Sequence, residues 1–310
     1  MNCVFLTFDV EDFINYRSIH SLSHILKLLQ RYKLKAIFFI TGHMAEKISN
    51  NKSILDILQN HEIGYHSSSH SVRPIIPEFT DVKNYLLAVQ ISLKRETSHI
   101  CSLTGDIEND GGIKILREIF PSKEVNSFRA PGLCWSPPHL EAIMKIGIKF
   151  DFSTHKIVYD KPLFYKGITF YPTPIEIDML KLKDLSNIFP LILRNKFTTL
   201  FAHPNIYVNL NHWDSIFFDG NPKELTGVAP RSKKYTMFSL YKLKMILVFL
   251  YLLRKKGMIE VTPDLETSKE KISVKKINIK DVYKSSMLWC RFFKYKPKFL
   301  FSHFKKYFRE

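Results

Sequence analysis

The stretch that decides the fold is CVFLTFDVED, at residues 3–12. Six mostly apolar residues are followed by Asp-Val-Glu-Asp, which places three carboxylates, Asp9, Glu11 and Asp12, within four residues. A short apolar run bounded by polar residues is typical of a buried strand. In parallel α/β folds the carboxyl ends of the strands carry the reactive groups, so these acids indicate a site. The simpler alternative is a solvated turn after an edge strand.

Apolar runs and helical stretches alternate along the rest of the chain, which predicts an α/β fold with a parallel sheet or barrel of seven or eight strands. The expected strands are Cys3–Phe8, Ala36–Ile40, Glu62–Tyr65, Val125–Phe128, Ile148–Phe150, Ile168–Tyr171, Thr198–Phe201 and Met258–Val261. The expected helical stretches are Ile25–Lys33, Ile54–Gln59, Leu140–Ile146 and Leu240–Leu253. We expect a barrel domain over residues 1–265 and a basic, aromatic-rich extension over 266–310.

Positive charge is concentrated near the C-terminus of this 310-residue chain, whose formal net charge is +17. Residues 1–230 hold 25 basic and 23 acidic side chains, whereas residues 231–310 hold 21 and 6. The body is therefore nearly neutral, which argues against a nucleic-acid cleft in the barrel. Hydrophobic residues make up 45% of the chain, enough for a sizeable core and too many for a disordered protein.

Two histidines, His66 and His70, follow the expected strand Glu62–Tyr65. On a helical turn this spacing places both imidazoles on one face, which suits Zn²⁺ or a similar divalent ion. Chance surface histidines are the alternative. Together with a carboxylate from residues 9–12, the pair predicts a site with two histidines and one carboxylate and with positions open to water and substrate.

Three further polar residues mark the ends of other expected strands: Arg129, Asp151 and His203. Each alone is explained as well by a buried salt bridge or a hydrogen-bonded core histidine. The coincidence at five strand ends favours a common site.

These motifs resemble the polysaccharide deacetylases of the NodB-homology type, carbohydrate esterase family 4. The similar segments occur in the family's order between Cys3 and Pro263, and the resemblance implies a distorted (β/α)7 barrel. The segments are Thr7-Phe8-Asp9, His66-Ser67-Ser68-Ser69-His70, Arg129-Ala130-Pro131, Asp151-Phe152-Ser153 and His203-Pro204.

The resemblance implies a divalent metal, most often Zn²⁺, bound by His66 and His70. The family commonly has two adjacent aspartates in its first motif, whereas Val10 follows Asp9 here. The carboxylate ligand is therefore Glu11 or Asp12. If the strand continues, alternation places Glu11 on the side of Asp9, while Asp12 reaches the metal only if the chain turns.

By the same resemblance, Asp9 is the general base that deprotonates water and His203 protonates the departing amine. Arg129 is expected to orient Asp9, and Asp151 to hold His203 in its tautomer. Gly132-Leu133 replaces a tyrosine-glycine pair that is common in the family, so the substrate groove is expected to differ.

The chain shows no secretory signal at its start, and its four cysteines are scattered, which favours a cytoplasmic protein. No transmembrane helix is expected. Residues 281–310 combine ten aromatic with eight basic side chains, which suits peripheral binding to an anionic membrane at its inner face. Packing of these aromatics on the barrel, or RNA stacking, are the alternatives for this segment.

The predicted function is metal-dependent removal of an N-acetyl group from an amino sugar, in a surface polysaccharide or its intracellular, possibly lipid-linked, precursor. The alternatives are hydrolysis of a non-sugar amide or ureide, and a catalytically silent carbohydrate-binding barrel.

Overall fold

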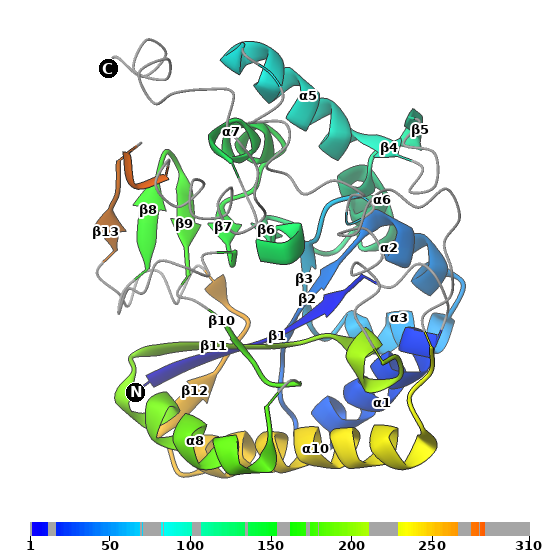
Figure 1. Cartoon of the computed structure of the whole chain (residues 1–310), viewed down its shortest axis with the longest axis vertical. Helices are drawn as coiled ribbons and strands as arrows, with labels where there is room; N and C mark the ends of the chain where they lie inside the picture. Colours follow the sequence, from blue (N-terminus) through cyan, green and yellow to red (C-terminus); the bar gives the residue numbers. More distant parts are fainter. Residues whose placement is uncertain are drawn as a thin grey trace.

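The protein folds around one curled, mostly parallel sheet that is covered by helices (Figure 1). The computed structural model describes residues 2–11, 17–68, 70, 82, 84–100, 107–133, 136–153, 162–171, 174–178, 180–210, 229–265, 274–278 and 280–282.

The main sheet runs in the order β10, β11, β1, β2, β3, β6, β7, β9, β8, β13, with β12 also paired to β1. Its strands are β1 (Asn2–Val10), β2 (Ile37–Ile40), β3 (Glu62–Tyr65), β6 (Ser127–Phe128), β7 (Phe150–Asp151), β8 (Leu163–Tyr165), β9 (Ile168–Phe170), β10 (Pro174–Glu176), β11 (Phe197–Ala202), β12 (Ile259–Val261) and β13 (Lys275–Lys276). A separate antiparallel pair is formed by β4 (Ser98–Ile100) and β5 (Ile107–Asp110).

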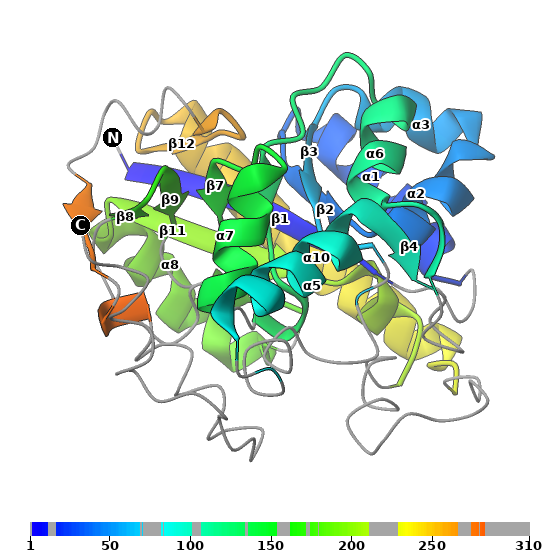
Figure 2. The ribbon, with the colours of Figure 1, turned by 90° about the horizontal axis from the view of Figure 1, so that it is seen from above.

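Figures 1 and 2 show α1, α2 and α3 beside β2 and β3, and α8 and α10 on the side of β1 and β11. The described helices are α1 (Arg17–Arg31), α2 (Gly42–Ser49), α3 (Lys52–Leu58), α5 (Tyr85–Thr97), α6 (Gly112–Ile119), α7 (Pro137–Lys145), α8 (Leu185–Arg194) and α10 (Lys233–Lys255), with short 3-10 turns at Pro131–Leu133, Leu182–Asp184 and Pro204–Tyr207.

Strand β1 is central because it pairs in parallel with three strands, β2, β11 and β12. Its side chains alternate between two cores. Val4, Leu6 and Phe8 pack into the larger core with the helices, while Cys3 and Phe5 join a smaller aromatic core with Phe39, Phe152 and Tyr171. The same alternation places Asp9 and Glu11 on the side of Phe5.

The predicted α/β fold class is confirmed: the protein is built on one curled, mostly parallel sheet covered by helices. All eight expected strands are present; β3 has the predicted bounds, and the other seven have shifted ends. The short strands β8, β10 and β13 and the β4–β5 pair were not predicted, because runs of two to four residues give too little periodicity.

The chain beyond residue 265 contributes to the domain. β13 pairs with β8, and Val282 is buried in the main core. Residues 283–310 lie outside the described part of the chain, so membrane binding through residues 281–310 stays a prediction.

Helix α10 is long and apolar enough to span a membrane by length and composition. Its buried residues, among them Leu243, Ile246, Leu247 and Leu250, follow helical spacing and lie in the main core. This stripe is typical of a helix packed on a soluble domain.

His61, directly before β3, gives folding stability a pH dependence. Its Nδ1 accepts a hydrogen bond from the backbone N–H of Ala36 at 3.2 Å. Burial, helped by the charges of Lys123 and Lys35, lowers the pKa of His61 from 6.5 to about 4. The unfolded chain therefore takes up this proton before the folded chain does, so stability falls as the pH drops from about 6.5 towards 4.

We expect the titration of His61 to reduce the free energy of unfolding by about 2 kcal/mol when the pH is lowered from 7 to 5. His61→Asn retains an acceptor for Ala36 but does not titrate, so its urea-unfolding free energy should fall less over this range. Parallel pH slopes for the two proteins would contradict the assignment.

Candidate active site

The turn after β3 presents two histidines from a strained backbone. Ser67 and His70 both have positive φ, 64° and 58°, a region that side chains other than glycine rarely adopt. The backbone N–H of His70 donates to Ser67 Oγ at 2.9 Å, and a Cβ on Gly112 would come within 2.7 Å of the turn's backbone. Strain held by such close packing is typical of functional sites.

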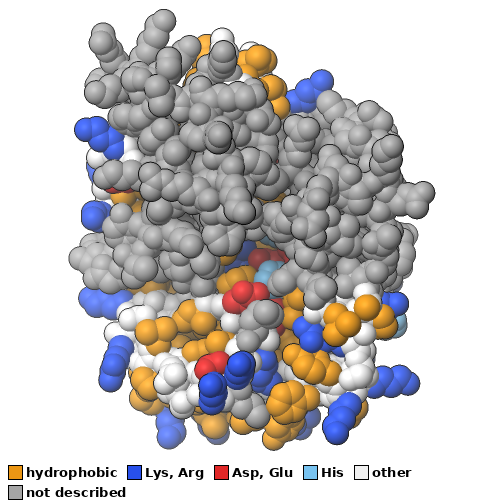
Figure 3. Space-filling model, viewed as in Figure 1, with side chains coloured by type: hydrophobic (Ala, Val, Ile, Leu, Met, Phe, Trp, Pro, Cys, Tyr) orange, Lys and Arg blue, Asp and Glu red, His pale blue; other side chains and the backbone are white. Residues whose placement is uncertain are grey.

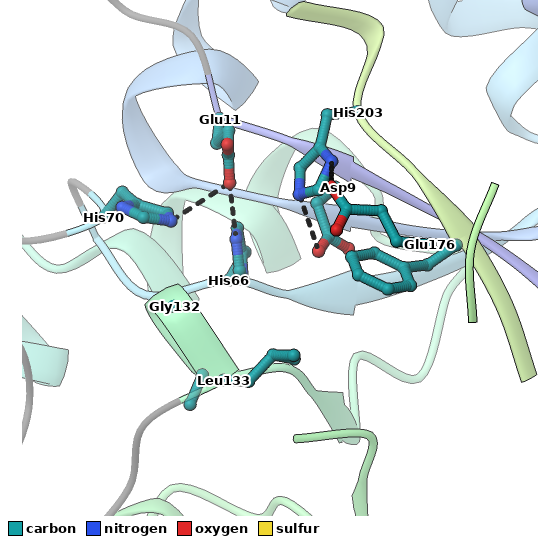
Figure 4. A pocket seen from close by; sticks show the side chains of 10 residues that line it. Asp9, Glu11, His66, His70, Gly132, Leu133, Glu176 and His203 are labelled. Atoms are coloured by element: carbon teal, nitrogen blue, oxygen red, sulfur yellow. Dashed lines mark hydrogen bonds and ion pairs between the residues drawn. The ribbon is translucent and has the colours of Figure 1, made fainter. Parts of the chain in front are cut away.

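Glu11, His66 and His70 converge at the end of β1 (Figure 4). Glu11 Oε2 lies 3.0 Å from Nε2 of each histidine, and all three residues are buried. His66 Nδ1 lies 2.6 Å from the carbonyl oxygen of Arg129, to which it donates. If His66 is neutral, its only N–H is at Nδ1, so the lone pair of Nε2 faces the oxygen of Glu11. Two electron-rich atoms that face each other are stabilised by a cation bound between them.

This donor set fits a divalent metal ion. One carboxylate oxygen and two imidazole nitrogens suit Zn²⁺, whose bonds of about 2.0–2.2 Å place neighbouring ligand atoms roughly 3.3 Å apart. The structure thus brings together Glu11, His66 and His70 of the four predicted ligands. Asp12, the alternative carboxylate, lies outside the described residues.

Asp9 lies beside this cluster and is held by Arg129. Its Oδ1 accepts a hydrogen bond from Arg129 Nη1 at 2.6 Å, while its Oδ2 lies 3.8 Å from His203 Nε2. Arg129 is fully buried, with its guanidinium 4.6 Å from the ring centroid of Phe39 and 5.1 Å from that of Phe201. The ion pair fixes one carboxylate oxygen and directs the other towards the pocket.

His203 follows β11 and is held by Asp178. Asp178 Oδ2 accepts from the backbone N–H of His203 at 2.6 Å and lies 3.0 Å from its Nδ1. Burial alone lowers the pKa of His203, but the carboxylates of Asp178, Glu11 and Asp9 together raise it well above its usual value. These carboxylates therefore favour the protonated form of His203, whose Nε2 faces Asp9 and the pocket.

The structure corrects the predicted role of Asp151. This carboxylate accepts hydrogen bonds from the backbone N–H and the hydroxyl of Ser153, whose Oγ in turn accepts from Ala130 N–H. Burial, opposed by Ser153 and Arg129, raises the pKa of Asp151 to about 7. Asp151 thus supports the loop after Arg129 through Ser153. It lies on β7, which four strands separate from β11 in the sheet order. The carboxylate that contacts His203 is Asp178 instead.

A buried lysine supports the segment that carries Asp178. Lys242 of α10 is 5% exposed, and its Nζ donates to the carbonyl oxygens of Asp178 and Leu180 at 2.7 and 2.6 Å. Helix α10 thus helps to fix the carboxylate that orients His203.

One family model matches the part of the chain that carries most of the candidate site. Residues 1–150, which contain Asp9, Glu11, His66, His70 and Arg129, match the family model described as "Polysaccharide deacetylase". Residues 1–150 are thus identified as a polysaccharide deacetylase domain. The chain is accordingly a hydrolase that acts on a carbon–nitrogen bond, as predicted. No match was found among the curated proteins.

Solved structures similar to this chain share its fold. A Mycobacterium smegmatis protein assigned to the polysaccharide deacetylases is 12% identical, with a TM-score of 0.54 over 89% of this chain and 93% of that one. A 4-alpha-glucanotransferase from Thermococcus litoralis is 10% identical, with a TM-score of 0.53 over 89% of this chain and 41% of that one. The allantoinase PuuE is 11% identical, with a TM-score of 0.51 over 86% of this chain and 89% of that one.

The pocket at this site measures about 170 Å³. Its lining residues are Asp9, Glu11, His66, His70, Ala130, Gly132, Leu133, Glu176, Phe201 and His203. Pockets that enclose drug-sized ligands measure roughly 300–1,000 Å³. The space is therefore large enough for a small chemical group but not for a whole drug-sized ligand. Figure 3 shows acidic and histidine side chains of the site at an opening on the molecular surface.

Sequence reasoning missed two carboxylates at this site, Glu176 and Asp178. Glu176 Oε1 lies 3.5 Å from His203 Nδ1. These acids alternate with apolar residues at the carboxyl end of β10, as Asp9 and Glu11 do on β1. That shared pattern was the signal that could have identified them.

Proposed function

We propose that the chain is a metal-dependent deacetylase that hydrolyses the N-acetyl group of an amino sugar, in a surface polysaccharide or its lipid-linked precursor. One observation carries the proposal. Two groups suited to opposite proton transfers, Asp9 and His203, lie 3.8 Å apart beside the cluster of Glu11, His66 and His70. Amide hydrolysis needs such a pair, because one proton leaves the water and another must reach the amine.

Asp9 is the proposed base. With Oδ1 held by Arg129, its Oδ2 accepts a proton from the water that attacks the acetyl carbonyl. His203 is the proposed acid: as the C–N bond breaks, it donates its Nε2 proton to the nitrogen of the departing amine. Asp178 stabilises the positive charge that His203 carries before this step.

Glu11, His66 and His70 are the proposed metal ligands. A divalent ion bound there, which we expect to be Zn²⁺ from the nitrogen and oxygen donors, would supply Lewis-acid polarisation of the carbonyl and the water.

The test of this function is acetate release from a panel of N-acetylated nucleotide sugars, lipid-linked sugars and oligosaccharides, with and without a chelator. We expect release from at least one of them and its loss on metal removal. Full activity after complete metal removal would exclude the mechanism. Release of amine only from non-sugar amides or ureides would favour the alternative that the chain hydrolyses such compounds. A chain that binds no metal and shows no activity would favour a catalytically silent carbohydrate-binding barrel.

The metal site makes a separate prediction. Glu11→Gln should lower metal affinity by at least about 100-fold, because losing a direct ligand costs more than the 10–100-fold typical of supporting residues. Metal per chain, measured by mass spectrometry after dialysis, reports the change. Asp12→Asn is the matched control and should retain its metal. The reverse result would make Asp12 the ligand.

A further inference from the structure

The outward side of α10 is apolar, although it faces solvent. Met237 is 72% exposed and Tyr241 57%, and four more large apolar side chains of this helix are also exposed. We call this set the α10 outer face: Tyr235, Met237, Phe238, Tyr241, Met245 and Leu252. A helix on the surface of a soluble domain normally carries polar residues there.

This face is continuous along the helix. From Met237 to Leu252 it extends about 22 Å, at 1.5 Å per residue. It lies opposite the buried stripe that includes Lys242, Leu243, Ile246 and Leu250, so α10 is apolar on both sides. Packing on the barrel explains the inner side and leaves the outer side without an explanation.

Many basic and very few acidic residues lie on and beside the helix that carries the α10 outer face. Between residues 233 and 258 the sequence has seven Lys or Arg and no Asp or Glu. The adjoining α8, whose Phe189 stacks on Phe249 of α10, is flanked by four basic residues and one acid, Asp184, within residues 181–196. Figure 3 shows hydrophobic and basic side chains intermixed over the part of the molecule where Figure 1 places α8 and α10.

The positive charge near the α10 outer face favours a membrane over another protein as its binding partner. Protein interfaces are depleted of lysine. Apart from the buried Lys242, residues 233–256 contain six basic side chains, and five of these are lysines. At an anionic bilayer each nearby Lys or Arg contributes about 1 kcal/mol, and exposed aromatic and Met side chains insert at the headgroup boundary. Arg231, stacked 4.2 Å over the ring of Tyr235, extends the basic rim.

We propose that the α10 outer face docks the protein on an anionic lipid bilayer, with the helix lying in the plane of the interface. This surface is distinct from residues 281–310. It does not depend on the proposed reaction, so docking and deacetylation can fail separately.

The experiment is co-sedimentation of the full chain with vesicles of phosphatidylcholine containing about 30% phosphatidylglycerol, and with phosphatidylcholine alone. We expect binding to the anionic vesicles that weakens at high salt. The triple variant Met237→Gln, Phe238→Gln, Tyr241→Gln should lower the partition coefficient by about tenfold or more. The matched control is Leu86→Gln, Leu87→Gln, which removes an exposed apolar pair on α5 and should change it less than twofold.

A charge variant keeps the proposal testable if the triple variant does not fold. Lys255→Glu, Lys256→Glu should weaken binding to anionic vesicles and leave binding to neutral ones unchanged. All variants retain residues 281–310, so a loss limited to the α10 variants reports this face alone. Three results overturn the proposal: no vesicle binding by the wild type, unchanged binding of both α10 variants, or a wild-type dimer in solution that the triple variant dissociates.

Discussion

Replacing Asp9 with asparagine should lower kcat/KM for deacetylation by roughly 10³-fold or more, within the range that positioned acids and bases contribute. The amide keeps the size of the carboxylate and can still accept the Arg129 hydrogen bond of 2.6 Å, but it cannot take a proton from water. Steady-state acetate release measures the effect.

Two controls make the Asp9 result interpretable. Metal per chain should be unchanged, because Glu11, His66 and His70 are intact, and the thermal unfolding midpoint should show a folded protein. Loss of activity together with loss of metal would point to a structural effect. Activity within about tenfold of wild type would exclude Asp9 as the base.

Asp178→Asn should lower kcat by about 10²-fold or more and change its pH dependence. A carboxylate that orients a catalytic histidine can contribute up to about 10⁴-fold. His203 must be protonated to act as the acid, so activity is lost as the pH rises through its pKa. Asp178 is one of the carboxylates that raise this pKa, so its removal lowers the pKa and moves the alkaline limb of the profile to lower pH.

Asp151→Asn is the matched control for Asp178. Both carboxylates are buried at or just beyond the carboxyl end of a short strand, but Asp151 accepts hydrogen bonds from Ser153 rather than from His203. We expect the alkaline limb of the pH profile of kcat for Asp151→Asn to coincide with that of the wild type. A shift caused by Asp151→Asn and not by Asp178→Asn would restore the original sequence-based assignment.

The sequence predicted most of the site because most of its parts are local. Asp9, His66, Arg129 and His203 each follow a recognisable apolar run, and carboxyl ends of parallel strands meet at one edge. Side-chain alternation also predicted that Glu11 would share a side with Asp9. These inferences need only the periodicity of a strand.

The partner of His203 depends on register, which the sequence did not reveal. Glu176 on β10 pairs with Phe201 on β11, so Asp178, two residues later, lies opposite His203. β10 is only three residues long, too short for its pairing to be recognised from apolar periodicity. Asp151 was predicted as the partner because the segment Asp151-Phe152-Ser153 resembles a motif of the family.

The pairing of β1 also determines when the protein can fold during its synthesis. β1 is made first, yet its neighbours β11 and β12 follow about 190 and 250 residues later. Until then the ribosome-bound chain holds an apolar strand whose edges lack two of their three partners, a condition that favours chaperone binding and aggregation. The 150 residues that match the family model therefore cannot form a complete sheet by themselves. A truncation that follows the sequence match would remove the strands that complete the domain.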